Sequence, residues 1–97
     1  MIILNFGKAL EFLKQGHKVA RKGWNGKGMF IYLVRGQKVA KCNLRNEAHL
    51  HLEVKDHHHE EITISSHVDM KAADGSIVVG WLASQTDMLA DDWEVIK

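Results

Sequence analysis

The sequence predicts a small α+β domain in which a mostly antiparallel sheet carries one longer N-terminal helix and one short C-terminal helix. Three observations predict it: apolar residues at helical spacing near the N-terminus, short β-branched and aromatic runs between turn residues, and a helix-capping pattern before the final apolar run. The chain has 97 residues, enough for one modest core, so we predict a single domain over residues 1–97.

The first predicted element is an amphipathic helix from about Phe6 to Gln15. Asn5 is suited to cap its start, and Gly16 is placed to end it. The apolar residues that recur at helical spacing, and that we assign to the core, are Phe6, Ala9, Leu10 and Leu13.

Short strands and turns follow. Val19 is the buried anchor of the first strand, and Asn25-Gly26 and Asp74-Gly75 are strong turn signals. Ser84 and Asp87 have the spacing of a capping box, which predicts a short helix. The predicted strands are 17–22, 29–34, 38–40, 62–64, 67–71, 77–79 and 93–96. We expect 38–40 to pair back on 29–34, 77–79 to be buried, and Trp93 to lie in the core.

Residues 41–61 form a polar, histidine-rich insertion or long hairpin, with a strand in the alternating stretch 48–54. On such a strand, His49 and His51 would share one face, as a metal pair would. Cys42 is the only cysteine, no HExxH motif occurs, and adjacent histidines within 57–59 point to opposite faces of an extended chain. We therefore favour a solvated loop, with no metal site and no cofactor.

Charge and hydropathy exclude several function classes. Thirteen Lys and Arg nearly balance twelve Asp and Glu, so nothing favours binding to a nucleic acid polymer or a membrane surface. The longest apolar run, Met29 to Val34, is too short to span a bilayer, and the N-terminus lacks the features of a signal peptide. We expect a cytoplasmic protein.

Two segments have sequence features beyond those that predict helices, strands and turns. One runs from Lys18 to Phe30 and contains Gly23-Trp24-Asn25-Gly26-Lys27-Gly28, and the other runs from Gly80 to Trp93 and contains Gly80-Trp81-Leu82-Ala83-Ser84-Gln85-Thr86-Asp87. With the opening stretch Asn5 to Leu10, they closely resemble a family of small phage and prophage proteins associated with Thoeris anti-defence.

The resemblance implies a homotetramer that sequesters the cyclic ADP-ribose-type signal of the host's Thoeris system without cleaving it. Some members of this family also take up cyclic oligonucleotides. The expected function is therefore non-enzymatic capture of a small cyclic nucleotide in the cytoplasm of an infected bacterium. Three apolar residues on one strand that we expect to be exposed, Met29, Phe30 and Tyr32, would then face identical neighbours.

Such a ligand needs an aromatic face for adenine, acceptors for ribose hydroxyls, and cations or backbone N–H groups for the pyrophosphate. Trp24 lies in a glycine-rich loop, where it serves either as a stacking face or as a lid on the sheet. Asp87 suits a ribose hydroxyl and could equally pair with Arg21. The predicted ligand-binding residues are Arg21, Trp24, Asn25, Gly26, Trp81, Ser84, Gln85, Thr86 and Asp87, and no residue is predicted to be catalytic.

Two alternatives stay open. The histidine-rich stretch could serve a metal-dependent hydrolase of a cyclic nucleotide, which would need bound metal and turnover. The chain could instead be a protein-interaction inhibitor of a host factor, which would retain no small molecule.

Overall fold

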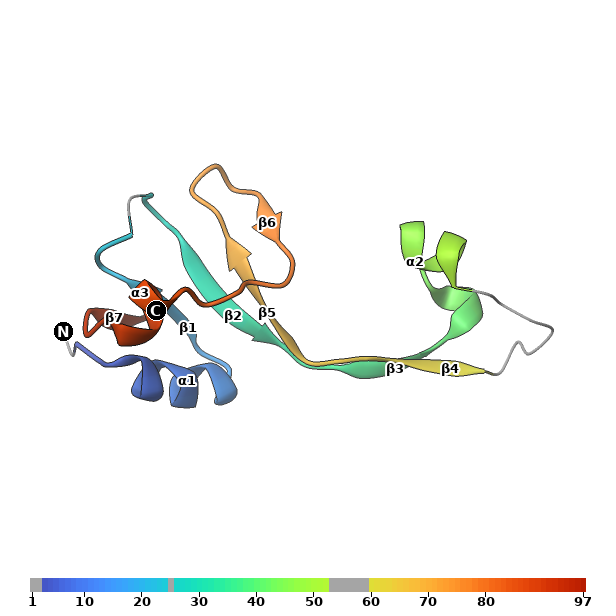
Figure 1. The fold of residues 1–97 in the computed structure, drawn as a ribbon, viewed down its shortest axis with the longest axis horizontal. Helices are drawn as coiled ribbons and strands as arrows, with labels where there is room; N and C mark the ends of the chain where they lie inside the picture. Colours follow the sequence, from blue (N-terminus) through green and yellow to red (C-terminus); the bar gives the residue numbers. More distant parts are fainter. Residues whose placement is uncertain (1–2, 25, 53–59) are drawn as a thin grey trace. The chain divides into compact units, whose positions relative to one another are not determined.

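The structure is a computed structural model, and it describes residues 3–24, 26–52 and 60–97. Short helices and strands are distributed along the described chain (Figure 1). The helices are α1 (Phe6–Lys14), the 3-10 helix η1 (Lys41–Asn43), α2 (Asn46–His51) and α3 (Gln85–Leu89). The strands are β1 (Lys18–Arg21), β2 (Phe30–Val34), β3 (Gln37–Ala40), β4 (Glu61–Ile64), β5 (His67–Lys71), β6 (Ile77–Val78) and β7 (Trp93–Ile96).

The chain divides into two compact units. The first, which we call the sheet unit, comprises Met1–Val34 and His67–Lys97, and the second, the hairpin unit, comprises Arg35–Ser66. Each has its own sheet: five strands in the order β6-β5-β2-β1-β7 in the first, and β3 with β4 in the second. Every strand pairing is antiparallel, which confirms the predicted α+β class.

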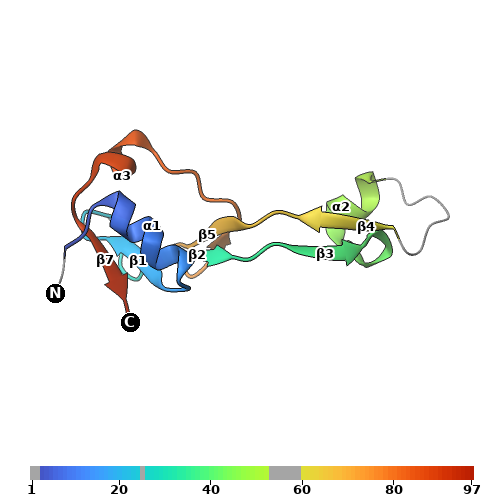
Figure 2. The same cartoon turned by 90° about the horizontal axis from the view of Figure 1, so that it is seen from below.

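One face of the sheet unit is covered by α1, which packs on β1, β2 and β7 (Figure 2). The buried core residues are contributed by the helix and by these three strands, and they are Ala9, Leu13, Val19, Ile31 and Trp93. Trp93 is fully buried, as its position in the final strand predicted. Removing so large a side chain from a core typically costs about 3–5 kcal/mol of stability.

The ends of α1 are formed by local chemistry. The Asn5 carboxamide oxygen accepts a hydrogen bond from the backbone N–H of Lys8 at 2.9 Å, so it satisfies one of the four unpaired donors of the first turn. Gly16 has a φ of +96°, a left-handed conformation that ends a helix at little cost only for glycine. The predicted helix is confirmed, although Leu10 is 37% exposed and is not part of the core.

The hairpin unit differs from the prediction in its pairing and in its helix. Residues 37–40 pair with β4 rather than folding back on residues 29–34. Residues 46–51 form α2, so the strand predicted over 48–54 is wrong in its described part, and residues 53–59 lie outside the described residues. The β3–β4 ribbon offers that stretch no paired strand, and a strand without a hydrogen-bonded partner is not stable.

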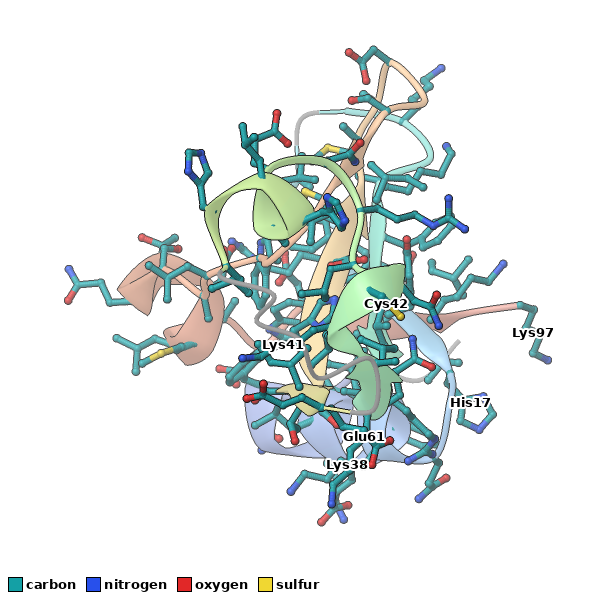
Figure 3. The ribbon with its side chains drawn as sticks, turned by 90° about the vertical axis from the view of Figure 1, so that its right-hand side faces the viewer. His17, Lys38, Lys41, Cys42, Glu61 and Lys97 are labelled. Atoms are coloured by element: carbon teal, nitrogen blue, oxygen red, sulfur yellow. The ribbon has the colours of Figure 1, made fainter. Side chains whose placement is uncertain are left out.

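The hairpin unit carries a polar surface on its strands. Lys38 and Glu61 are exposed and project outward from the ribbon (Figure 3), and Lys41 forms an ion pair with Glu60 at 2.9 Å. Leu44, which follows η1, is its one buried hydrophobic residue among those described.

The exposed apolar surface of the sheet unit lies elsewhere than predicted. Met29, Phe30 and Tyr32 are all half-buried. The strand expected to be buried over 77–79 is instead exposed, because β6 is the two-residue outer strand of the sheet and α1 covers only β1, β2 and β7. The most exposed large apolar residues in this region are Ile77 (60%), Val79 (71%), Leu82 (90%) and Leu89 (78%).

Candidate functional site

The loop between β1 and β2 carries Trp24, and two of its glycines are required by close packing. A Cβ on Gly23 would lie 2.7 Å from a carboxylate oxygen of Asp92 and 3.0 Å from the Arg21 guanidinium. A Cβ on Gly26 would lie 2.5 Å from the Ala73 Cβ. The contact of Gly26 with the Ala73 Cβ is shorter than two carbons can tolerate, and a side chain at Gly23 would displace the Asp92 carboxylate, so these glycines let the loop pack onto its neighbours. Asn25, another predicted ligand residue, lies outside the described residues.

Three tryptophans meet beside this loop. The ring of Trp24 packs edge-on against Trp93 with centroids 5.3 Å apart, and against Trp81 with centroids 6.3 Å apart. Trp81 and Trp93 are also in edge contact at 6.3 Å. Aromatic pairs favour such edge-to-face arrangements. Trp24 is therefore a lid on the core that stays partly exposed. Its role as a stacking face for a ligand stays a prediction.

Polar contacts hold the Trp24 loop to α3. Asp87 Oδ1 accepts a hydrogen bond from Trp24 Nε1 at 3.1 Å and from Arg21 Nη1 at 2.9 Å. The backbone carbonyl of the same residue accepts from Trp93 Nε1 at 3.0 Å. Asp87 thus binds two indole N–H groups and one guanidinium, so the pairing of Arg21 with Asp87 is confirmed.

Asp92 completes this network on its other side. Its Oδ1 accepts from Arg21 Nε at 2.8 Å, its Oδ2 lies 3.4 Å from Arg21 Nη2, and the same Oδ2 accepts from the backbone N–H of Gly23 at 2.8 Å. Bidentate pairing with a carboxylate is the geometry that a guanidinium favours. Arg21, with only 15% of its side chain exposed, is held between two carboxylates.

These contacts shift the pKa values of all three side chains. Burial raises the pKa of Asp87, but hydrogen bonds from Arg21, Trp24 and Ser84 outweigh it and leave the pKa below its ordinary value. The hydrogen bond from Arg21 is the main cause of the lowered pKa of Asp92, opposed by burial and supported by the Gly23 N–H. Hydrogen bonds to Asp92 and Asp87 raise the pKa of Arg21. All three groups are therefore charged at neutral pH.

The second predicted motif begins α3. Ser84 Oγ accepts from the backbone N–H of Asp87 at 3.1 Å, which confirms the predicted cap. Gln85 and Thr86 are exposed in the first turn. The structure brings this motif to the Trp24 loop through Asp87, and through the contact of Trp81 with Trp24.

A cavity of about 380 Å³ lies between the Trp24 loop and the strands β1 and β7. We call it the loop cavity. Its apolar and aromatic lining comes from Ala20, Trp24, Met29, Phe30 and Ile96. Its charged lining comes from Arg21, Lys22, Lys27 and Glu94, and Gly26 and Gly28 complete the wall.

Only part of the predicted site lines this cavity. Arg21, Trp24 and Gly26 do, whereas the predicted residues of the second motif, Trp81 and Ser84 to Asp87, do not. Sequence reasoning missed Phe30 and Glu94 as wall residues. The alternation of β7 was an available signal, because a strand that buries Trp93 on one face must place Glu94 on the other. The register then sets Glu94 beside Ala20.

The histidines do not form the strand pair that the sequence allowed. His49 and His51 lie on α2, where residues two apart face nearly opposite sides. The run 57–59 lies outside the described residues. Over residues 3–24, 26–52 and 60–97, no group of three or more His, Cys, Asp or Glu is placed to hold a metal ion.

The fold and this site define a small α+β protein in which an aromatic loop lines an open, charged cavity. In the described part of the chain, no helix is long and apolar enough to cross a membrane.

Comparison with known proteins identifies the family to which this chain belongs. Residues 4–96 match the Tad2-like family, described as the Thoeris anti-defense 2-like domain. The chain is also 37% identical over 94 residues to Thoeris anti-defense 2 of Bacillus phage SP01, covering 97% of this chain and 96% of that protein.

The chain therefore belongs to the Thoeris anti-defense 2-like family, as the sequence resemblance predicted. This membership makes Thoeris anti-defence its class of function. The match extends through the hairpin unit, so that unit belongs to the family's domain.

Proposed function

We propose that this protein blocks Thoeris defence by sequestering a cyclic ADP-ribose-type signal in the loop cavity without cleaving it. The observation that carries the proposal is the loop cavity itself, in a chain of the Thoeris anti-defense 2-like family. Its volume of about 380 Å³ falls within the range of small-molecule sites. The protein would act in the cytoplasm of an infected bacterium.

The chemistry of the cavity wall supports a nucleotide-type ligand. Trp24 and Phe30 offer aromatic surface for a base, and a base stack is worth about 1–3 kcal/mol. Lys22 and Lys27 bring cations suited to a pyrophosphate. Arg21 is already bound by Asp87 and Asp92, so we assign it to holding the loop in place rather than to gripping phosphate.

The exposed apolar surface around β6 and α3 supports the proposed homotetramer. Val79, Leu82 and Leu89 are each more than 70% exposed, and large exposed apolar side chains are often covered by other chains in an assembly. Light scattering at micromolar concentration is expected to give the mass of four chains. A monomer there would contradict the assembly.

Capture without cleavage is tested by incubating the protein with each cyclic ADP-ribose isomer, removing free ligand by filtration, and heating the protein to release what it holds. Mass spectrometry is expected to find the intact ligand in the heat-released fraction. A cleaved product would support a hydrolase instead. Retention of no isomer, together with a stable complex with a host protein, would support direct inhibition. Running a cyclic dinucleotide in parallel tests the wider ligand range.

A further inference from the structure

Glu94 presents an acceptor that the folded chain leaves unused. Its Oε2 atom is buried and has no hydrogen-bond partner, and no other buried side-chain nitrogen or oxygen within residues 3–24, 26–52 and 60–97 shares that condition. A buried acceptor without a partner costs about 1–3 kcal/mol, and more for a charged group. An unused carboxylate oxygen of this kind is expected where a ligand supplies the missing donor.

The position of Glu94 on β7 places its side chain in the wall of the loop cavity. Glu94 lies between Trp93, a core residue, and Val95, which packs against the core, so its side chain leaves the sheet on the face opposite α1. It pairs in register with Ala20, and both line the loop cavity.

The Arg21 guanidinium does not supply the missing donor to Glu94 Oε2. Arg21 also lines the cavity, but its three nitrogens are directed to Asp87 and Asp92. The Glu94 carboxylate oxygens are hydrogen-bond acceptors. The carboxylate therefore requires a hydroxyl or amino donor, and it repels a phosphate.

We propose that Glu94 is a specificity-determining residue of the loop cavity, accepting a hydrogen bond from a ribose hydroxyl or a base amino group of the bound nucleotide. Lys22 and Lys27 line the same cavity and are cations suited to the pyrophosphate. The cavity thereby offers both an acceptor for a donor group of the ligand and positive charge for its phosphates. This inference rests on the proposed capture of a cyclic ADP-ribose-type signal.

The test compares Glu94→Gln with the wild type and with Glu11→Gln, which neutralises an exposed glutamate of α1 outside the cavity. Calorimetric titration uses the cyclic ADP-ribose isomer that the wild type binds best. Glu94→Gln is expected to bind about tenfold more weakly, since the amide oxygen of Gln still accepts the hydrogen bond but no longer carries the charge that strengthens it. Glu11→Gln is expected to bind as the wild type does.

The thermal melt of the ligand-free protein separates this role from a structural one. An acceptor without a partner contributes nothing to the empty fold, so Glu94→Gln is expected to melt at the wild-type temperature or above it. A lower melting temperature would overturn the proposal, with or without a change in binding. Equal binding by Glu94→Gln and the wild type would also overturn it.

A ligand analogue with hypoxanthine in place of adenine distinguishes the two donors. If Glu94 accepts from the amino group, the wild type loses affinity for the analogue and Glu94→Gln adds no further loss. If Glu94 accepts from a hydroxyl, the substitution weakens binding of both compounds equally. A wild-type protein that captures no cyclic ADP-ribose isomer would reject the proposed function and this inference together, whereas failure at Glu94 alone leaves the proposed function standing.

Discussion

Arg21 Nη1 donates a hydrogen bond to Asp87 Oδ1 at 2.9 Å, although 66 positions separate the two residues in the chain. The same carboxylate oxygen accepts from Trp24 Nε1. The pair therefore ties three parts of the sheet unit together: the end of β1, the Trp24 loop and the first turn of α3. Arg21 and Asp87, which the sequence suggested as ligand contacts, bind each other. Their pairing holds the Trp24 loop in its conformation.

Asp87→Ala is expected to destabilise the protein. It removes the partner of a half-buried indole N–H and of a guanidinium nitrogen, and each lost hydrogen bond costs about 1–3 kcal/mol when its partner stays buried. For a domain of this size the melting temperature should fall by about 4–8 °C for each kcal/mol. Asp91→Ala is the matched control, because Asp91 is exposed. Equal melting of the two variants would contradict the bracing role of Asp87.

Stability is expected to fall at acid pH because of Asp87 and Asp92. Both have a folded-state pKa below the ordinary value of 3.8. Their contribution to the free energy of unfolding is therefore complete above that value, and it is lost as the pH falls through their lowered folded-state values. Thermal melts from pH 7 to pH 2 should show a decline that begins near pH 4. The double variant Asp87→Asn, Asp92→Asn should show a shallower decline, and an equally steep one would assign the acid sensitivity to other groups.

Trp24→Ala is expected to affect both stability and ligand capture. The ring packs against Trp81 and Trp93 and also lines the loop cavity. Loss of a stacking face should weaken binding about tenfold to a hundredfold. Trp24→Phe separates the roles in part, because it keeps a smaller aromatic face and removes the N–H that reaches Asp87.

Calorimetric titration and thermal melts of Trp24→Ala, Trp24→Phe and Trp93→Ala test this prediction. Trp93→Ala should lose about 3–5 kcal/mol as a core deletion, and its binding should fail only through unfolding. Wild-type affinity in a folded Trp24→Ala protein would move the ligand site away from the loop.

The sheet unit is expected to fold and bind without the hairpin unit. Val34 and His67 are the last register pair of β2 and β5, so Arg35–Ser66 can be replaced by Asn-Gly, which favours a two-residue hairpin turn. All residues that line the loop cavity remain. The shortened protein, which also lacks the histidine run, should melt cooperatively and retain the nucleotide. Cooperative melting with complete loss of capture would place part of the site in the hairpin unit.

The sequence by itself determined those features that depend on neighbours along the chain. Asn5 and Gly16 bound α1, Ser84 caps α3, and the short β-branched runs form strands. These features follow from capping chemistry, allowed backbone angles and residue periodicity, all of which act within a few residues.

Only the tertiary structure decided which side chains meet and which remain uncovered. The sequence left the pairing of Arg21 with Asp87 as one of two alternatives. The contact forms because β1 pairs with β7 and α3 precedes that strand. Residues 77–79 have the composition of a buried strand, yet β6 lies at the edge of the sheet beyond the cover of α1. Glu94 becomes a wall residue of the loop cavity only because the Trp24 loop packs beside β7 in the folded chain. Burial and pairing depend on the arrangement of distant segments, so the donors, acceptors and walls of the loop cavity exist only in the folded chain.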